Sequence, residues 1–245
     1  MTNIKLTVAY DGTDFCGWQT QDNDDTSQGR IENALLKLHG HEVKLNGAGR
    51  TDSGVHAVGQ CANFLTDMTM PPEKFREALN SFLPSGIRIL RSEVVPDDFH
   101  ARYDATERIY KYYMLPLSMC YPHTDRYCLG IKNSMDINIL NDIVTPLLGT
   151  HDFSSFSSVM EDGYPMERTV KSIVFYESRG YTVFKISADG FLRRMVRAIV
   201  GTSLELYSKG KNALDMSAIL EAKNRDAAGA CAPAKGLFLD RVIYD

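Results

Sequence analysis

The alternation of apolar and polar positions predicts a strand at the start of the chain and a helix after it. The first apolar residues recur at every second position: Ile4, Leu6, Val8 and Tyr10. A period of two is typical of a strand with one buried face. The next apolar residues recur at helical spacing: Ile31, Ala34, Leu35 and Leu38. Gly40 follows where a helix C-cap belongs, so we predict an amphipathic helix over 28–39.

The remaining pattern predicts further strands and helices in alternating groups. The predicted strands cover 41–48, 55–65, 87–95, 99–115, 168–177, 181–188 and 236–245. One predicted helix begins after Pro71 and Pro72 and stops before Pro84. The other predicted helices cover 135–148, 190–207 and 213–223, with Pro146 late in the first of them.

Runs of strands interrupted by helices predict an α+β protein with mainly antiparallel sheets. We place the boundary between two halves near residue 105, giving an N-terminal half over 1–105 and a C-terminal half over 106–245. No long Pro/Gly linker separates the halves, so we expect them to pack firmly.

Composition is that of an ordinary globular protein. Of the 245 residues, 44% are apolar and 24% are charged, which excludes disordered and collagen-like classes. The net charge of -4 argues mildly against nucleic acid as a partner, unless the cations gather on one face. The sequence has neither a membrane-length apolar run nor a signal-peptide start, and its five cysteines are scattered, so we expect a cytoplasmic protein.

A glycine-rich loop over 47–57, GAGRTDSGVHA, carries Arg50 and Asp52 between two predicted strands. A tight turn in which Asp52 or Ser53 caps a neighbouring amide is one interpretation of it. The other is catalytic, because an ionised carboxylate can act as nucleophile or stabilise charge at a sugar C1′. Spacing alone does not separate these two interpretations.

Three arginines cluster near the end of the chain. If residues 190–207 form one helix, Arg193, Arg194 and Arg197 share a face while apolar neighbours point to the core. A solvated basic face or salt bridges between the halves would explain this pattern. Contacts to phosphate, with one arginine holding a catalytic carboxylate, would explain it equally well.

An aromatic and basic stretch covers 99–113 and contains Arg102 and Tyr110. Cations beside rings can bind a single-stranded or flipped base, although aromatic strand residues are more often core. Cys120, His123 and Cys128 lie close in sequence but form only weak evidence for zinc. We assign no role to His56 or His151.

Taken together, these motifs resemble the tRNA pseudouridine synthase A family along nearly the whole chain. The segments that carry the resemblance are 10–19, 26–32, 49–57, 99–102, 108–112, 151–156, 191–201 and 232–237. The resemblance implies the pseudouridine synthase fold, with two ferredoxin-like halves whose sheets merge around a central cleft. It also implies a homodimer that converts uridine to pseudouridine at positions 38, 39 and 40 of the tRNA anticodon stem-loop.

The resemblance also implies roles for individual residues. Asp52 would be the catalytic nucleophile, Arg197 would orient it, and Tyr110 would stack on the target base and take part in proton transfer. Arg50 would hold the target nucleotide out of its stack, and Arg102, Arg193 and Arg194 complete the expected substrate-binding set.

The implied reaction needs no cofactor or metal. It breaks the N1–C1′ bond, turns the uracil and forms C5–C1′, so one carboxylate can suffice where hydrolysis uses two. Attack of Asp52 at C1′, attack at C6 and a glycal route all remain open. Two alternatives to the synthase are a non-catalytic RNA-binding module of the same fold and a glycosidase-type enzyme, for which the sequence offers no convincing second acid.

Overall fold

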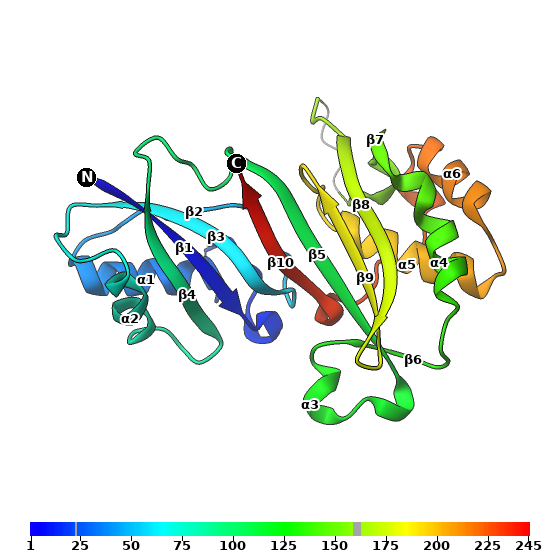
Figure 1. Ribbon diagram of the computed structural model, residues 1–245, viewed down its shortest axis with the longest axis horizontal. Coiled ribbons are helices and arrows are strands. Elements are labelled where there is room, and N and C mark those ends of the chain that lie inside the picture. The colour runs from blue at the N-terminus through cyan, green and yellow to red at the C-terminus, as the bar shows by residue number, and fades with distance from the viewer. Residues whose placement is uncertain (23, 159–162) are drawn as a thin grey trace. The chain divides into compact units, whose positions relative to one another are not determined.

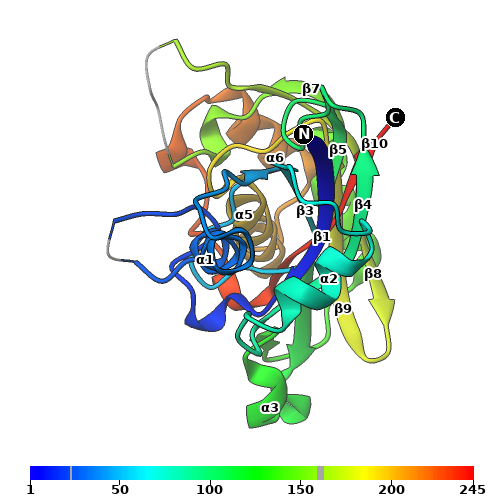
Figure 2. The ribbon, with the colours of Figure 1, turned by 90° about the vertical axis from the view of Figure 1, so that its left-hand side faces the viewer.

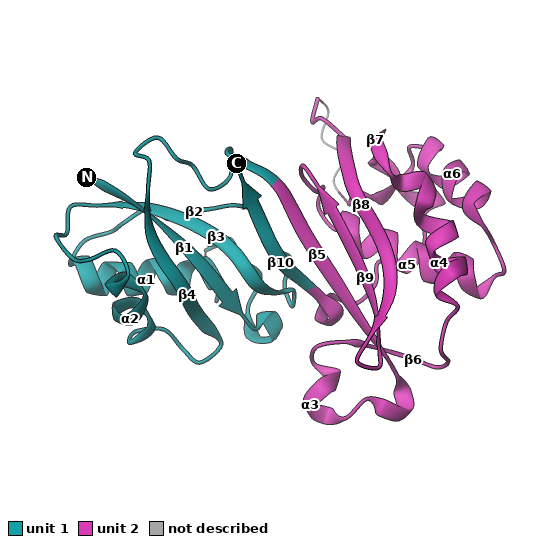
Figure 3. Cartoon of the chain, viewed as in Figure 1, with its two compact units in different colours: residues 1–106, 238–245 teal, residues 107–237 magenta. Residues whose placement is uncertain are grey.

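The computed structural model describes residues 1–22, 24–158 and 163–245. The chain divides into two compact units, shown in different colours in Figure 3. Unit 1 comprises residues 1–106 and 238–245, and unit 2 comprises residues 107–237. The last eight residues therefore belong with unit 1, although the predicted C-terminal half over 106–245 includes them.

Unit 1 is built on strands β1 (Thr2–Tyr10), β3 (His56–Thr66), β4 (Ile87–Val95) and β10 (Leu237–Tyr244), with β1 between β4 and β3. β1 pairs antiparallel with both neighbours, while β10 pairs parallel with β3. A two-residue strand, β2 (Asn46–Gly47), pairs antiparallel with β3. The apolar residues that predicted β1 are all buried, so this prediction is confirmed.

Helix α1 (Ser27–His39) runs alongside one face of these strands (Figure 2). Thr26 caps its first turn by accepting from the Gly29 amide, and Gly40 ends it in the left-handed conformation with φ 77°. The predicted helix is therefore confirmed. Helix α2 (Lys74–Asn80) packs on the same strands through Phe75, whose ring meets Phe64 edge-on at 5.5 Å.

Unit 2 contains strands β5 (Ala105–Pro116), β9 (Tyr181–Ala188), β8 (Glu167–Ser178) and β7 (Gly149–Asp152), paired antiparallel in that order. A short strand, β6 (Leu129–Ile131), runs parallel to β5. Helices α4 (Ile137–Val144), α5 (Met195–Ser208) and α6 (Ala213–Glu221) gather beside β8 and β9 (Figure 1). The short helix α3 (Pro122–Asp125) follows β5. Both units thus confirm the predicted α+β class with mainly antiparallel strands.

Some predicted element bounds are wrong. The strand predicted over 41–48 is reduced to β2, and the alternating Val43 and Leu45 are buried in the irregular segment before it. The helix predicted over 135–148 stops at Val144, and Pro146 lies in a short 3-10 turn instead. Proline has no amide hydrogen for a helical bond, which explains this early end.

The strand predicted to begin at residue 99 begins only at Ala105. Residues before it form a turn, in which the His100 amide donates to the Asp104 carboxylate at 2.8 Å and the Arg102 amide donates to His100 Nδ1 at 3.1 Å. The Asp104 and His100 side chains thereby accept hydrogen bonds from amides that, in a strand, would donate to the neighbouring strand. Arg102 consequently lies on a turn of unit 1, not on the strand that carries Tyr110.

Candidate active site

The Asp52 loop, residues 47–57, is held in unit 1 by main-chain contacts on both sides. The Ala48 amide donates to the Cys61 carbonyl at 2.8 Å, and the Gln60 side-chain amide donates to the Gly49 carbonyl at 2.9 Å. These bonds attach the first part of the loop to β3. Beyond Asp52, the Val55 amide donates to the Asp52 carbonyl at 3.1 Å and closes a tight turn.

The segment after β1 supports the other side of this loop. The Trp18 amide donates to the Thr51 carbonyl at 3.1 Å, and the Ser53 hydroxyl donates to the Phe15 carbonyl at 3.2 Å. A Cβ on Gly17 would lie 2.7 Å from the Thr51 carbonyl oxygen, and Gly17 has a φ of +94°. Only glycine fits this position, because it tolerates both the close approach and the positive φ.

Asp52 itself is half-buried, between the buried Thr51 and the exposed Ser53. The loop therefore fixes the main chain on both sides of Asp52, while the residue as a whole stays partly exposed. This arrangement suits a group that must meet a ligand at a set angle.

His56 is a buried structural neighbour of the loop. Its ring stacks on Phe238 with centroids 4.6 Å apart, and its Nδ1 accepts from the Gly12 amide at 3.0 Å. The Asp11 Oδ1 atom also lies 3.2 Å from this nitrogen, so His56 connects the loop to the segment after β1.

Two further predicted site residues of unit 1 are exposed. Within the described residues, the side chain of Arg50 has no hydrogen-bond or ion-pair partner. Arg102 places its guanidinium 5.7 Å from the centre of the Tyr103 ring, and that ring also packs on His100. Both arginines can therefore offer charge to a ligand outside the unit.

Tyr110 lies on β5 in unit 2, opposite Ile186 of β9, and is 8% exposed. Phe191 meets its ring edge-on at 5.1 Å and 85°. Tyr112 shares its face of the strand but is fully buried, and its hydroxyl donates to the Pro233 carbonyl at 2.8 Å. Burial raises the pKa of Tyr112 far above its usual range, and Arg197 offsets this only in part, so Tyr112 remains a neutral structural donor.

Arg197 lies in the first turn of α5 and is partly buried. Its Nε donates to the Ala232 carbonyl at 2.8 Å, while the Ala232 amide donates back to the Arg197 carbonyl at 2.9 Å. We call this reciprocal pair the Arg197 brace. It directs the guanidinium through a side-chain bond to the main chain, which is stronger when the donor is charged.

Close packing on both sides supports the Arg197 brace. A Cβ on Gly201 would overlap the Ala230 carbonyl oxygen, so α5 can approach the 229–233 segment only with glycine at this position. The Gly229 amide also donates to the Thr202 hydroxyl at 3.0 Å. Together with the Tyr112 bond to Pro233, these contacts immobilise the chain that carries the Ala232 carbonyl.

The predicted sharing of one helical face by three arginines is wrong. α5 begins at Met195, and Arg194 precedes it with φ 64° in the left-handed region. The Met195 amide donates to the Leu192 carbonyl, which closes a turn that carries Arg193. Arg193 and Arg194 are exposed on this turn and, among the described residues, their guanidinium groups have no partner. Only Arg197 belongs to the helix.

The described part of the chain contains no group of three or more His, Cys, Asp or Glu side chains that could hold a metal ion. Cys120 and Cys128 are free thiols, and burial together with the neighbouring Cys120 raises the pKa of Cys128 to about 11. In the same residues, no helix combines the length and apolarity needed to cross a membrane.

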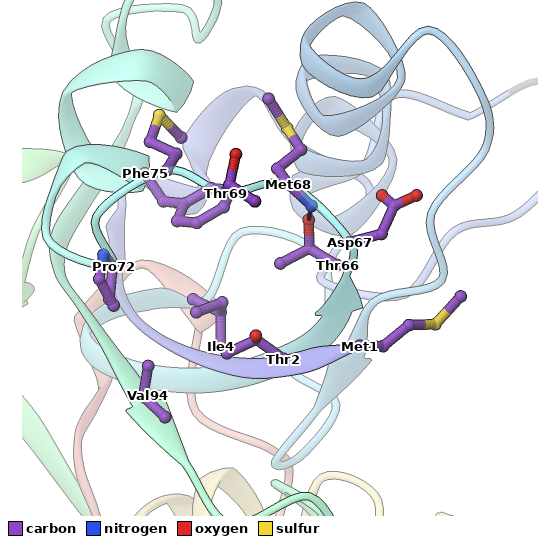
Figure 4. A pocket seen from close by; sticks show the side chains of 11 residues that line it. Met1, Thr2, Ile4, Thr66, Asp67, Met68, Thr69, Pro72, Phe75 and Val94 are labelled. Atoms are coloured by element: carbon purple, nitrogen blue, oxygen red, sulfur yellow. Dashed lines mark hydrogen bonds between the residues drawn. The ribbon is translucent and has the colours of Figure 1, made fainter.

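A cavity of about 440 Å³ lies elsewhere in unit 1 (Figure 4). Its lining includes Met1 and Ile4 at the beginning of β1, together with Met68 and Phe75. The Asp52 loop contacts the other end of β1, at Tyr10. None of the predicted site residues lines this cavity, so it is separate from the candidate site.

The sequence pattern does not reveal the groups that hold the Asp52 loop and the Arg197 side chain. Nothing in the loop motif indicates that Thr51 bonds to Tyr10 and Trp18. The Ala232 carbonyl, which holds Arg197, has no side-chain signature at all. Both lie in segments that carried the family resemblance, which was the one signal available for them.

Comparisons with known proteins place these motifs in a family. A family model described as tRNA pseudouridine synthase matches residues 6–104 and 143–245. A tRNA pseudouridine synthase A of Treponema denticola is 42% identical over 248 residues, covering 99% of this chain and 92% of the relative. The tRNA pseudouridine synthase A 2 of Clostridium tetani is 42% identical over 245 residues, covering 99% of each chain.

A third relative, the tRNA pseudouridine synthase A of Halalkalibacterium halodurans, is 40% identical over 98% of this chain and 92% of its own length. Among solved structures, a chain of a Cbf5-Nop10-Gar1 complex matches 96% of this chain and 48% of its own, with a TM-score of 0.40 and 12% identity. That structural likeness is too low to add to the assignment. The sequence matches confirm the predicted family: this chain belongs to the tRNA pseudouridine synthases.

Proposed function

We propose that this protein is an isomerase that converts uridine to pseudouridine in the anticodon stem-loop of tRNA, with Asp52 as the nucleophile. The observation that carries the proposal is the Asp52 loop: within a chain of this family, the half-buried Asp52 lies on a main chain that is held on both sides. Family membership supports tRNA as the substrate and pseudouridine as the product.

The proposed reaction requires few catalytic groups besides one positioned carboxylate. The N1–C1′ bond breaks, the freed uracil turns, and C5 bonds to C1′, after which C5 loses its proton and N1 holds one. The base that leaves is also the nucleophile that returns, so no water has to be activated. No electrons are gained or lost overall, and we propose that the protein works without a metal or cofactor.

Each remaining residue has a proposed role that suits its surroundings. Arg197, directed by its brace, orients Asp52, because a guanidinium beside a carboxylate favours the charged form. Tyr110 stacks on the target base and takes part in proton transfer. Arg50 holds the flipped nucleotide, an event that costs a few kcal/mol of lost stacking.

In this proposal, the exposed arginines bind phosphates of the tRNA backbone. Arg102, Arg193 and Arg194 lie on turns, where long side chains can follow a phosphate chain. The net charge of -4 does not by itself oppose binding, because a local group of cations can attract phosphates on an acidic protein. We further propose that the protein acts in the cytoplasm and that it forms a homodimer. Light scattering of the pure protein would test the homodimer.

The test uses the full chain, unmodified tRNA transcripts and carbodiimide mapping of pseudouridine, with a chelator present. Wild type should form pseudouridine at the anticodon stem-loop without any addition. Asp52→Asn should reduce the rate at least about 10³-fold, because the nucleophile is lost. The exposed Asp98→Asn serves as the matched control and should retain wild-type turnover.

Filter binding to the same tRNA separates this proposal from its alternative. Asp52→Asn should bind tRNA with nearly wild-type affinity, since the carboxylate contributes to chemistry and little to attraction of a polyanion. A wild-type protein that binds tRNA and forms no product would support the non-catalytic RNA-binding module instead. Equal product from Asp52→Asn and wild type would reject Asp52 as the nucleophile.

A further inference from the structure

Thr51, the residue immediately before Asp52, has a buried hydroxyl with a defined partner. Its side-chain oxygen lies 2.7 Å from the hydroxyl oxygen of Tyr10, and the two residues are 8% and 5% exposed. Tyr10 is the last residue of β1, and its ring lies beside Trp18 with centroids 5.7 Å apart. The hydroxyl pair therefore joins the Asp52 loop to the end of a core strand.

The main chain of Thr51 is held as well. Its carbonyl accepts the Trp18 amide, and Gly17 approaches it so closely that no side chain fits there. Residue 51 is thus bonded through both its side chain and its carbonyl. On the far side of Asp52, the Val55 amide holds the Asp52 carbonyl. The main chain of Asp52 is therefore held on both sides.

Threonine suits this position better than serine would. A β-branched side chain has few allowed rotamers, so a bonded threonine hydroxyl also restrains the main chain beside it. Both residues are buried within unit 1, so we do not expect their hydroxyls to touch a large substrate. They would affect a bound ligand only through the position of Asp52.

We propose that Tyr10 and Thr51 are positioning residues, whose hydroxyl–hydroxyl bond sets the direction in which the Asp52 carboxylate leaves the loop. This inference rests on the proposed function. A displacement of about 1 Å at a reacting group can cost on the order of 10²-fold in rate. Loss of the bond therefore slows the chemical step and leaves tRNA binding intact.

The first test compares Thr51→Val with Thr51→Ser in single-turnover pseudouridine formation. Valine keeps the branched shape and loses the hydroxyl, whereas serine keeps the hydroxyl. We expect Thr51→Val to lower the rate at least about tenfold and Thr51→Ser to stay within about threefold of wild type. The tRNA dissociation constant should change by less than about twofold in both variants.

Tyr10→Phe removes the other half of the pair with almost no change in volume. It should slow the reaction as much as Thr51→Val does, and the double variant should be no slower than either single variant. Thr66→Val is the matched control in unit 1. It loses a hydroxyl that is bonded to His39 and accepts from the Met68 amide, both away from the loop, and it should retain the wild-type rate.

Amide hydrogen exchange tests the positioning without using activity. The Val55 and Trp18 amides, which bond the carbonyls of Asp52 and Thr51, should exchange at least about tenfold faster in Thr51→Val and Tyr10→Phe than in wild type or Thr51→Ser. Amides in the centre of β3 should keep their wild-type rates. This pattern would separate a local change from general destabilisation.

The outcomes distinguish the two proposals. A wild-type chain that forms no pseudouridine rejects the proposed function, while the exchange rates still decide whether the hydroxyl pair holds the loop. A Thr51→Ser variant as slow as Thr51→Val overturns the positioning role, as do additive losses in the double variant. Unchanged exchange at Val55 and Trp18 in both hydroxyl-deleting variants overturns it as well.

Discussion

Asp52, the proposed nucleophile, and Arg197, the residue proposed to orient it, are held in opposite ways. Asp52 lies on an irregular loop of unit 1 whose main chain is bonded on both sides of it. Arg197 lies in the first turn of a helix in unit 2, where its own side chain is bonded to the Ala232 carbonyl. Asp52 is thus positioned by bonds to the main chain of its loop. The Arg197 side chain is instead positioned by a hydrogen bond that it donates itself.

This difference predicts which substitutions disturb each region. Substitutions of neighbouring residues that move the backbone should disturb the Asp52 loop. Any change in the shape of the cation should disturb the Arg197 brace. Guanidinium and ammonium carry the same charge but offer donors in different geometries. Arg197→Lys can therefore change the shape of the cation while keeping its charge, whereas the loop is tested by substitutions that move its backbone.

Among the variants that test how the two residues are held, Arg197→Lys has the largest expected effect, since it keeps the charge and removes the planar fork. A lysine ammonium cannot donate to the Ala232 carbonyl from the Nε position and also present a second face to a carboxylate. We expect the single-turnover rate to fall about 10²-fold, with tRNA affinity within about twofold.

Arg168→Lys is the matched control, since Arg168 also donates to main-chain carbonyls of unit 2 and has no proposed role. Its rate should equal that of wild type. An Arg197→Lys variant with full activity would show that charge alone is sufficient, and the contrast between brace and loop would then be lost.

A second variant, Gly201→Ala, removes the close approach that supports the brace. The added Cβ would meet the Ala230 carbonyl oxygen, so α5 or the 229–233 segment has to shift. We expect the free energy of unfolding to fall by about 2 kcal/mol, the usual cost of overpacking, as measured by urea denaturation.

Gly190→Ala tests whether any added methyl would do the same. Its Cβ would come no closer than 3.4 Å, to the flexible side chain of Arg168, and the cost should stay below about 0.5 kcal/mol. Equal destabilisation by the two alanines would argue against a specific close approach at Gly201.

A smaller effect is expected at the exposed turn before α5. Arg193→Ala and Arg194→Ala should each weaken tRNA binding about threefold and reduce the salt slope by about one. The rate at saturating tRNA should not change, in contrast to Arg197→Lys. Arg193→Lys and Arg194→Lys, which keep the charge, should restore affinity; failure of both lysine variants to do so would indicate directed contacts in place of simple phosphate attraction.

The smallest effect concerns acid stability. Burial alone would raise the pKa of Asp152, but hydrogen bonds from the Ser154 hydroxyl and amide and the nearby Lys223 ammonium outweigh it, so the pKa is lowered. A lowered carboxyl pKa stabilises the fold above the unfolded value of about 3.9, and this contribution is lost as the pH falls through the folded value.

Asp152→Asn should therefore lower the free energy of unfolding by about 0.5–1 kcal/mol at pH 7, a figure that allows for partial exposure of the pair. The difference from wild type should shrink toward pH 3. In unit 1, Asp25 and Arg30 form a more exposed pair, and Asp25→Asn should cost less. Urea denaturation at both pH values checks this, and a difference that grows toward pH 3 would contradict it.

The sequence by itself determined the elements whose residues carry a clear period. The alternation from Ile4 to Tyr10 predicted β1, and helical spacing closed by Gly40 predicted α1, because both depend on local geometry and burial. Motif order along the chain was also sufficient for the family, and with it for the expected roles of Asp52, Arg197 and Tyr110.

Tertiary structure decided what depends on partners distant in the chain. No local pattern shows that Arg194 adopts a left-handed conformation and leaves Arg193 off the helix, or that the Ala232 carbonyl meets Arg197 from 35 residues away. The bond between Tyr10 and Thr51 likewise spans 41 residues. Such contacts form only when the chain folds back on itself, so hydrophobic periodicity, which reports burial, carries no information about them.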